Sequence, residues 1–264
     1  MKSIAHQSAA EMGGRVSVLS RQKRDHVRLD NLLGRLGETP PGGRDPVLRA
    51  IYRLVFPHAF AEEAVLWPVI RRVLPEGHAL TLKVEQEHQE INVLVTRLEG
   101  IEPGSAAHQE VLTQMVELLR QDVRDEEDEL LPSLQAKLSG AQLRLLGVAW
   151  EAVRWIAPTR AHPIVARRPP GNWLSALPLA IIDRCRDATD ALAGRNRGLA
   201  GTPLRAVSSG LAQVSHGIER LPGMRRGEDP STRMSRGSRG VWTFVALAAV
   251  ATASGAVAAR RRSR

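Results

Sequence analysis

Two short stretches of the chain share a spacing that suits metal binding. The first, HAFAEE at 58–63, places His58 four residues before Glu62. The second, DVRDEE at 122–127, places Asp122 at the same offset before Glu126. Residues four apart lie on one face of an α-helix, about 6 Å apart along it. Each stretch therefore offers two donor side chains to one ion, with aspartate in the second copy where the first has histidine.

Four helices would have to position these residues. Apolar residues recur every three or four positions in four stretches, at 24–36, 47–74, 79–99 and 109–138. His26 lies in phase with the apolar residues of the first stretch, and His88 with those of the third. Clusters of Pro and Gly separate the stretches and forbid one continuous helix.

The four stretches are two copies of one helix pair. The first aligns with the third, so that His26 falls on His88, and the second aligns with the fourth through the Glu-Glu stretches. Short loops make helices that follow each other antiparallel, which predicts an up-down-up-down bundle. Equivalent polar residues of the two pairs then meet near the bundle axis.

Six inward-facing donors result, and three of them are anionic: His26, His58, Glu62, His88, Asp122 and Glu126. Burying several carboxylates without compensation is too costly, and two metal ions would supply the missing positive charge. Imidazole and carboxylate donors in a helical bundle suit iron, manganese or zinc, and iron fits best if dioxygen chemistry is involved. A single one of these residues is more often an ordinary core histidine or a solvated glutamate, so the joint pattern carries the prediction.

This set of residues resembles the hemerythrin HHE cation-binding family. The resemblance covers roughly residues 21–138 and rests on His26, HAFAEE, EH at 87–88 and DVRDEE, with an apolar pair and Pro after each Glu-Glu. It implies an all-α fold, an antiparallel four-helix bundle holding an oxo- or hydroxo-bridged non-haem di-iron centre. It also implies that Glu62 and Glu126 bridge two iron ions, with terminal ligands at His26, His58, His88 and position 122.

Asp122 departs from the family pattern, which usually has histidine at this position. Aspartate keeps an oxygen donor and adds a negative charge, but it is shorter than imidazole, so coordination needs a helix shift or an intervening water. As a ligand it would favour ferric iron and weaken reversible dioxygen binding. The alternative is that Asp122 is not a ligand and that the nearest metal position is loose or empty.

The remaining acids and histidines of this kind are expected to have no direct role. Glu63 and Glu127 lie about 100° around the helix from the proposed bridges, so they should face solvent or support the ligands from behind. Five further histidines have no partner in phase and are expected at the surface: His6, His78, His108, His162 and His216.

Composition favours helices and excludes a disulfide within the chain. Aromatic residues make up only 3% of the chain, which argues against a sheet sandwich, and Cys185 is the single cysteine, which excludes an intramolecular disulfide. The first twenty residues do not resemble a secretory signal, so we expect the bundle in the cytoplasm.

Charge and composition divide the chain further. Net charge is −4 over residues 1–140, +9 over 141–240 and +4 over 241–264. Residues 241–259 are uncharged and flanked by arginines, which predicts a transmembrane helix and a single-pass C-terminal membrane anchor.

The part between the bundle and this segment is harder to interpret. The stretch PTRAHP at 158–163 is similar to one in extended family members, and the sequence assigns it no function. The expected parts are a flexible N-terminus at 1–20, the bundle at 21–140, additional helices at 141–192, a disordered basic linker at 193–240, the transmembrane helix at 241–259 and a basic tail at 260–264.

Three functions remain open at this point. The first is a membrane-tethered di-iron protein that binds or senses dioxygen, nitric oxide or peroxide. The second is an enzyme that uses the same centre to break down peroxide or to oxidise ferrous iron. The third is a metal-free helical interaction module with a degenerate site, whose basic tail contacts acidic lipid or nucleic acid, although we do not expect nucleic acid to be the partner.

Overall fold

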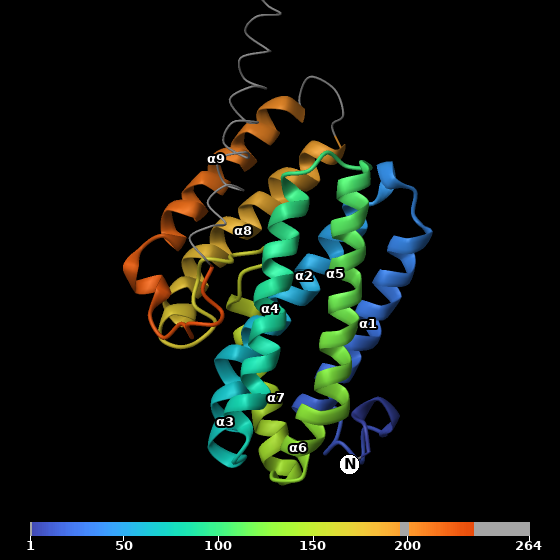
Figure 1. The fold of residues 1–264 in the computed structure, drawn as a ribbon, viewed down its shortest axis with the longest axis vertical. Helices are drawn as coiled ribbons and strands as arrows, with labels where there is room; N and C mark the ends of the chain where they lie inside the picture. Colours follow the sequence, from blue (N-terminus) through green and yellow to red (C-terminus); the bar gives the residue numbers. More distant parts are fainter. Residues whose placement is uncertain (1, 196–200, 235–264) are drawn as a thin grey trace, which may run out of the picture.

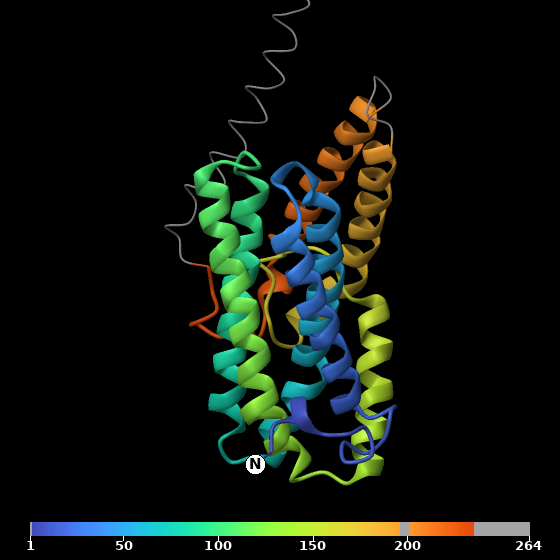
Figure 2. The ribbon, with the colours of Figure 1, turned by 90° about the vertical axis from the view of Figure 1, so that its right-hand side faces the viewer.

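Four long helices run up and down along the long axis of the molecule (Figures 1 and 2). They belong to a computed structural model that describes residues 2–195 and 201–234. The four are α1 (Val18–Glu38), α2 (Asp45–Ala61), α4 (Gly77–Glu99) and α5 (Ala106–Asp125). Shorter helices extend two of them, namely α3 (Trp67–Val73) after α2 and α6 (Leu131–Gln135) after α5. Every regular element in the described part is helical.

Two apolar clusters fill the bundle, one above and one below a polar layer. Along α1, for example, Leu19 belongs to one cluster and Leu29 to the other, with His26 between them. The same order holds along α4, where His88 lies between Val84 and Ile91. The polar residues of the predicted site are therefore enclosed by packed hydrocarbon at both ends of the polar layer, which limits their contact with water.

Three further helices cover one side of this bundle. Helix α7 (Gly140–Ile156) packs against α1 and α2. Its Gly147 is required, because a Cβ there would lie 2.0 Å from the carbonyl oxygen of Val16. Helices α8 (Gly171–Arg195) and α9 (Gly201–Glu219) pair with each other (Figure 1). Arg53 of α2 holds α8 through an ion pair of 2.8 Å to Asp187.

Two segments expected to be flexible or disordered are ordered in part. In the N-terminal segment, Ile4 and Met12 are buried in the apolar cluster that contains Leu19. In the stretch 193–240, expected to be a disordered basic linker, the structure places α9 and a short turn at Pro222–Arg225. Apolar residues recur every three or four positions along α9, from Leu204 to Ile218, but the face that the structure buries carries small and polar residues such as Ser208 and Ser215. The division into domains stays a prediction.

The membrane part of the fold and localisation predictions is corrected. Within residues 2–195 and 201–234, no helix has both the length and the apolar character needed to cross a bilayer. The long helices are amphipathic instead, and α8, the longest, buries Asp183 and Asp187. The predicted anchor at 241–259 falls outside the described residues, and we retain neither the transmembrane helix nor the membrane localisation.

Candidate metal centre

Each of the two Glu-Glu stretches begins a wide π-helical turn. The turns span Glu62–Leu66 and Glu126–Leu130 and join α2 to α3 and α5 to α6. Pro68 and Pro132 follow them at the same offset. Proline has no N–H, and its ring collides with the carbonyl four residues earlier, so a wider turn relieves the clash. The repeated proline thus accounts for the widening at the glutamates.

Three buried histidines orient their rings in the same way: His26, His58 and His88. Their Nδ1 atoms lie 2.9 Å, 3.3 Å and 3.0 Å from carboxylate oxygens of Glu127, Asp25 and Glu63, respectively. An ionised carboxylate only accepts hydrogen bonds, so each Nδ1–H donates and fixes the tautomer. The Nε2 atoms, which face the bundle axis, are left to bind a metal.

Glu62 and Glu126 each turn their two carboxylate oxygens toward different histidines. Oε1 of Glu62 lies 3.1 Å from Nε2 of His58, and Oε2 lies 3.7 Å from Nε2 of His88. Oε2 of Glu126 lies 3.1 Å from Nε2 of His26, and Oε1 lies 3.8 Å from Nε2 of His88. A carboxylate that bridges two metal ions presents its oxygens in this way.

The donors separate into two positions that share Glu126. His26, His58 and Glu126 have ligand atoms within 4.8 Å of one another, and so do Glu62, His88 and Glu126. At the first position, the two histidine Nε2 atoms are 3.3 Å apart. Two nitrogens that bind one ion at about 2.1 Å each lie about 3 Å apart, so the spacing suits one metal ion.

The inward carboxylate oxygens need a positive partner. In the described part of the chain, the buried oxygens of Glu62 and Glu126 and Oδ1 of Asp122 contact no donor except the Nε2 atoms of histidines that are themselves ligand candidates. Buried carboxylates left in this state cost several kcal/mol each. The residues present therefore fit a pair of cations, which would pair with these oxygens.

When no metal is bound, protons supply part of the positive charge that the buried carboxylates need. Although burial opposes it, hydrogen bonds to Glu126 and Glu127 raise the pKa of His26 to about 10. Burial also opposes the shift at His58, whose pKa rises to about 9 through the charge of Glu62 and a hydrogen bond to Asp25. Burial, together with the charge of Glu126, raises the pKa of Glu62. Metal ions that bind here must displace these protons.

The comparisons with known proteins agree with this geometry. Residues 17–134 match the family model described as the hemerythrin HHE cation binding domain. Residues 17–134 are a hemerythrin HHE domain. The chain is also 26% identical over 131 residues to an uncharacterized hemerythrin-like protein of Schizosaccharomyces pombe, covering 49% of this chain and 64% of that one. No solved structure matches the chain.

A second relative matches the chain over the same number of residues. A DNA nickase of Nostoc is 26% identical over 131 residues, again 49% of this chain but 37% of the nickase. This chain therefore spans less than two thirds of either relative. The family resemblance inferred from the sequence is confirmed for residues 17–134, and membership of this family suggests that these residues bind a metal cation.

All six ligand candidates of the hemerythrin domain come together in the structure. Asp122, the departure from the family pattern, is buried, and its Oδ1 lies 3.5 Å from Nε2 of His88. That separation is close to the spacing of two donors on one ion, but Asp122 belongs to neither group of three donors whose ligand atoms lie within 4.8 Å of one another. Burial, together with neighbouring carboxylates such as Glu126, raises the pKa of Asp122 well above its usual range.

Sequence reasoning left open the role of the second glutamate of each pair. Glu63 is almost fully buried and bonds to His88, while Glu127 bonds to His26 at the edge of the domain. Both therefore orient the ring of a ligand candidate, which is one of the two alternatives predicted. Asp25, which does the same for His58, was not identified, although it directly precedes His26.

His162, like His108, was expected at the surface and is buried. It lies outside the hemerythrin match, in the loop between α7 and α8. Its Nε2 is 3.0 Å from Asp183 and its Nδ1 is 2.8 Å from Glu219. Although burial opposes it, the charge of Asp183 and the bond to Glu219 raise the pKa of His162 to about 10. Its partners lie 21 and 57 residues away, so no local spacing in the sequence could reveal the cluster.

Proposed function

We propose that the hemerythrin domain binds two iron ions and uses them to bind or sense a small oxidant such as dioxygen, nitric oxide or peroxide. The observation that carries this proposal is the orientation of Glu62 and Glu126, whose paired oxygens point to different histidines. One ion would bind His26 and His58, and the second would bind His88 and Asp122. The glutamates would bridge the two.

The two positions differ in their donors. The first has two imidazoles and the second has one, with Asp122 supplying an additional carboxylate. Carboxylate donors favour the harder, oxidised form of iron, whereas imidazole suits both states. Bound iron supplies the change of oxidation state and a place for a small ligand. The chain supplies fixed histidine tautomers and a water-poor, apolar enclosure.

A groove between α1 and α5 connects this centre with solvent. It has a volume of about 390 Å³, and both His26 and Glu127 line it. Lys23, Arg120 and Arg124 lie at the same groove and attract small anions. We infer that small ligands approach the first metal position through this groove.

Anion binding tests the groove together with the centre. Iron-loaded protein should develop new visible absorption when azide is added. Val27→Trp, which places an indole at the groove, should slow azide binding at least about tenfold, a barrier of about 1.4 kcal/mol. Val148→Trp on α7 is the matched control, because Val27 and Val148 are both 54% exposed. Equal rates in the two variants would rule out this route, and a spectrum insensitive to azide would argue against ligand binding at the metal.

A di-iron enzyme is the second candidate function, and Asp122 favours it. The additional anionic donor stabilises ferric iron, which suits oxidation of ferrous iron or breakdown of peroxide better than reversible dioxygen binding. Steady turnover of peroxide or of ferrous iron would support the enzyme. The name of the Nostoc relative describes that protein, and we propose no nickase activity for this chain.

Asp122 itself can be tested by two substitutions. Asp122→Ala should weaken binding of the second metal ion by at least about tenfold, because the position loses an anionic donor. Asp122→His should keep both ions and give the spectrum of a more nitrogen-rich centre. Asp128→Ala, on an exposed position of the next turn, is the control. Unchanged metal content and spectrum in Asp122→Ala would remove Asp122 from the site.

A further inference from the structure

Residues beyond the hemerythrin domain reach the carboxylates that support the metal-facing histidines. Helix α7 carries Arg154, whose Nη2 lies 3.0 Å from Oδ2 of Asp25. The same Asp25 oxygen accepts the Nδ1–H of His58. Trp150, one turn earlier on α7, holds the arginine from the other side, because the guanidinium lies 4.5 Å from the centre of its ring. Trp150 also meets the ring of His58 edge-on at 5.3 Å.

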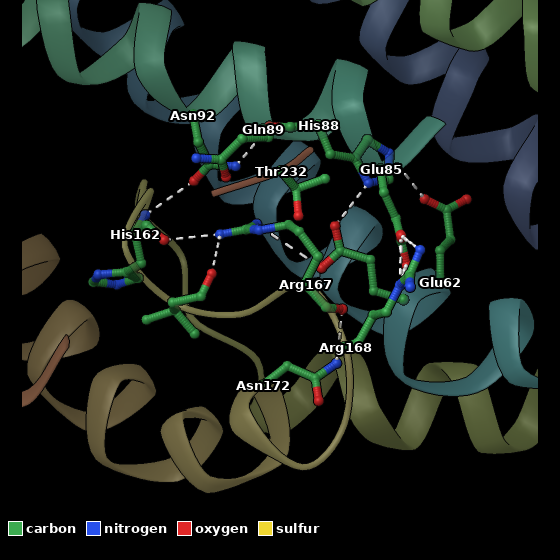
Figure 3. A network of polar contacts seen from close by, with 12 residues as sticks. Glu62, Glu85, His88, Gln89, Asn92, His162, Arg167, Arg168, Asn172 and Thr232 are labelled. Atoms are coloured by element: carbon green, nitrogen blue, oxygen red, sulfur yellow. Dashed lines mark hydrogen bonds and ion pairs between the residues drawn. The ribbon is translucent and has the colours of Figure 1, made fainter. Parts of the chain in front are cut away.

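A second arginine contacts the carboxylate that supports His88. Arg167 lies in the loop between α7 and α8, and its Nη1 is 3.8 Å from Oε2 of Glu63. The other oxygen of Glu63 accepts the Nδ1–H of His88. Nη2 of Arg167 donates to the carbonyl oxygen of His162 at 2.8 Å, which anchors the guanidinium between the loop and the domain (Figure 3). In both cases the arginine contacts a carboxylate, and that carboxylate accepts the Nδ1–H of a histidine whose Nε2 faces the metal position.

The carboxylates around the centre outnumber the positive charges that two divalent ions would bring. Six carboxylates contact the histidines or the metal positions: Asp25, Glu62, Glu63, Asp122, Glu126 and Glu127. Two divalent ions would neutralise four of these charges. Arg154 and Arg167 supply the remaining two positive charges, each next to one of the outer carboxylates.

We propose that Arg154 and Arg167 are positioning residues of the metal centre, through which the C-terminal extension holds His58 and His88 and sets how easily the bound iron is oxidised. This inference rests on the proposed function. A carboxylate behind a metal-bound histidine fixes the ring and makes it more basic, and an arginine on that carboxylate limits both effects. A positive charge at this place also opposes a further positive charge on the metal.

The sign of the effect follows from the charge. Removing either arginine leaves the centre with one more unbalanced negative charge, which favours ferric over ferrous iron. Arg154→Met and Arg167→Met should therefore lower the midpoint potential of the iron-loaded protein. The expected change is about tenfold in the preference for ferric iron, which is about 59 mV for a one-electron couple. Arg154→Lys retains the charge and should retain most of the potential.

Two other arginines provide matched controls. Arg21 ties α1 to α7 through Glu151 at 2.5 Å, and Arg168 ties the same loop to α4 through Glu85 at 2.7 Å. Neither contacts a carboxylate behind a proposed ligand. Arg168→Met loosens the docking of the loop without touching either pair, so it reports the effect of docking alone. Arg21→Met loosens the docking of α7 in the same way, but it also leaves Glu151 to Arg154, which pairs with it at 3.4 Å, so it reports any indirect effect through Arg154 as well.

The experiment is a redox titration of the iron-loaded full chain, followed by its visible spectrum, for the wild type and these five variants. The inference is supported if the potential falls in Arg154→Met and Arg167→Met and stays near the wild-type value in Arg154→Lys and in both controls. It is overturned if the two methionine variants shift no further than the controls. A wild-type chain that takes up no iron overturns the proposed function as well, whereas normal iron uptake with equal potentials overturns this inference alone.

Discussion

Replacing Glu126 by alanine should abolish binding of both metal ions. Glu126 belongs to both groups of donors, and each of its oxygens faces a different histidine. Its loss removes one anionic donor from each position at once, and the remaining histidines repel cations more as long as they stay protonated. Loss of a single terminal ligand, as in His58→Ala, should affect mainly one ion. Elemental analysis of iron-loaded protein gives the number of ions per chain directly.

Glu129→Ala is the control for this substitution. Glu129 lies in the same wide turn and its side chain is exposed. It should bind both ions as the wild type does, and circular dichroism should show that both variants are folded. If Glu126→Ala retained two ions per chain, Glu126 would not be a bridge and the two-metal account would be wrong.

His162→Ala should destabilise the metal-free chain by about 3–5 kcal/mol, because it leaves buried acids without their cationic partner. Asp183 is fully buried and Glu219 nearly so, and both contact His162 (Figure 3 shows the neighbouring contacts of this residue). Urea unfolding measures the change. His78→Ala, at an exposed position, should have little effect. A loss below about 1 kcal/mol, the usual size for a surface change, would contradict the buried ion pair.

The same residue predicts how stability depends on pH. The pKa of His162 rises from an ordinary value of 6.5 to about 10 in the folded chain. A raised pKa means that the folded state binds the proton more tightly, so the contribution is complete below about pH 6.5 and is lost as the pH rises toward 10. The wild type should therefore lose more stability over this interval than His162→Ala. Parallel curves for the two proteins would mean that His162 is not held in its charged form.

The bundle and its inward residues were accessible from the sequence because their signals are local and repeated. Spacing of four residues places His58 above Glu62 on one helix face, and the second copy repeats it with Asp122 and Glu126. The helix bounds expected from apolar periodicity agree with the structure within about three residues, since packing and periodicity agree within the bundle. The exception is the start of the first helix, since α1 begins at Val18, six residues before the expected start. The π turns were not foreseen, although Pro68 and Pro132 mark them in the sequence.

The C-terminal part was less accessible because its packing reverses the usual pattern. Helix α9 buries Ser208 and Ser215, whereas Val207 and Val214 are exposed. Small side chains allow α8 and α9 to approach closely, but they resemble a linker in composition. The contacts of Arg154 and Arg167 with the hemerythrin domain are likewise set by tertiary structure, which no local spacing records.

Anomalous diffraction at the iron absorption edge, from crystals of the iron-loaded full chain, would locate the proposed ions directly. Two peaks are expected inside the bundle, about 3.5 Å apart as in other two-metal sites. One peak should lie at the Nε2 atoms of His26 and His58, and the other between His88 and Asp122. Both should contact Glu62 and Glu126. A single peak, or no peak between these two glutamates, would contradict the account.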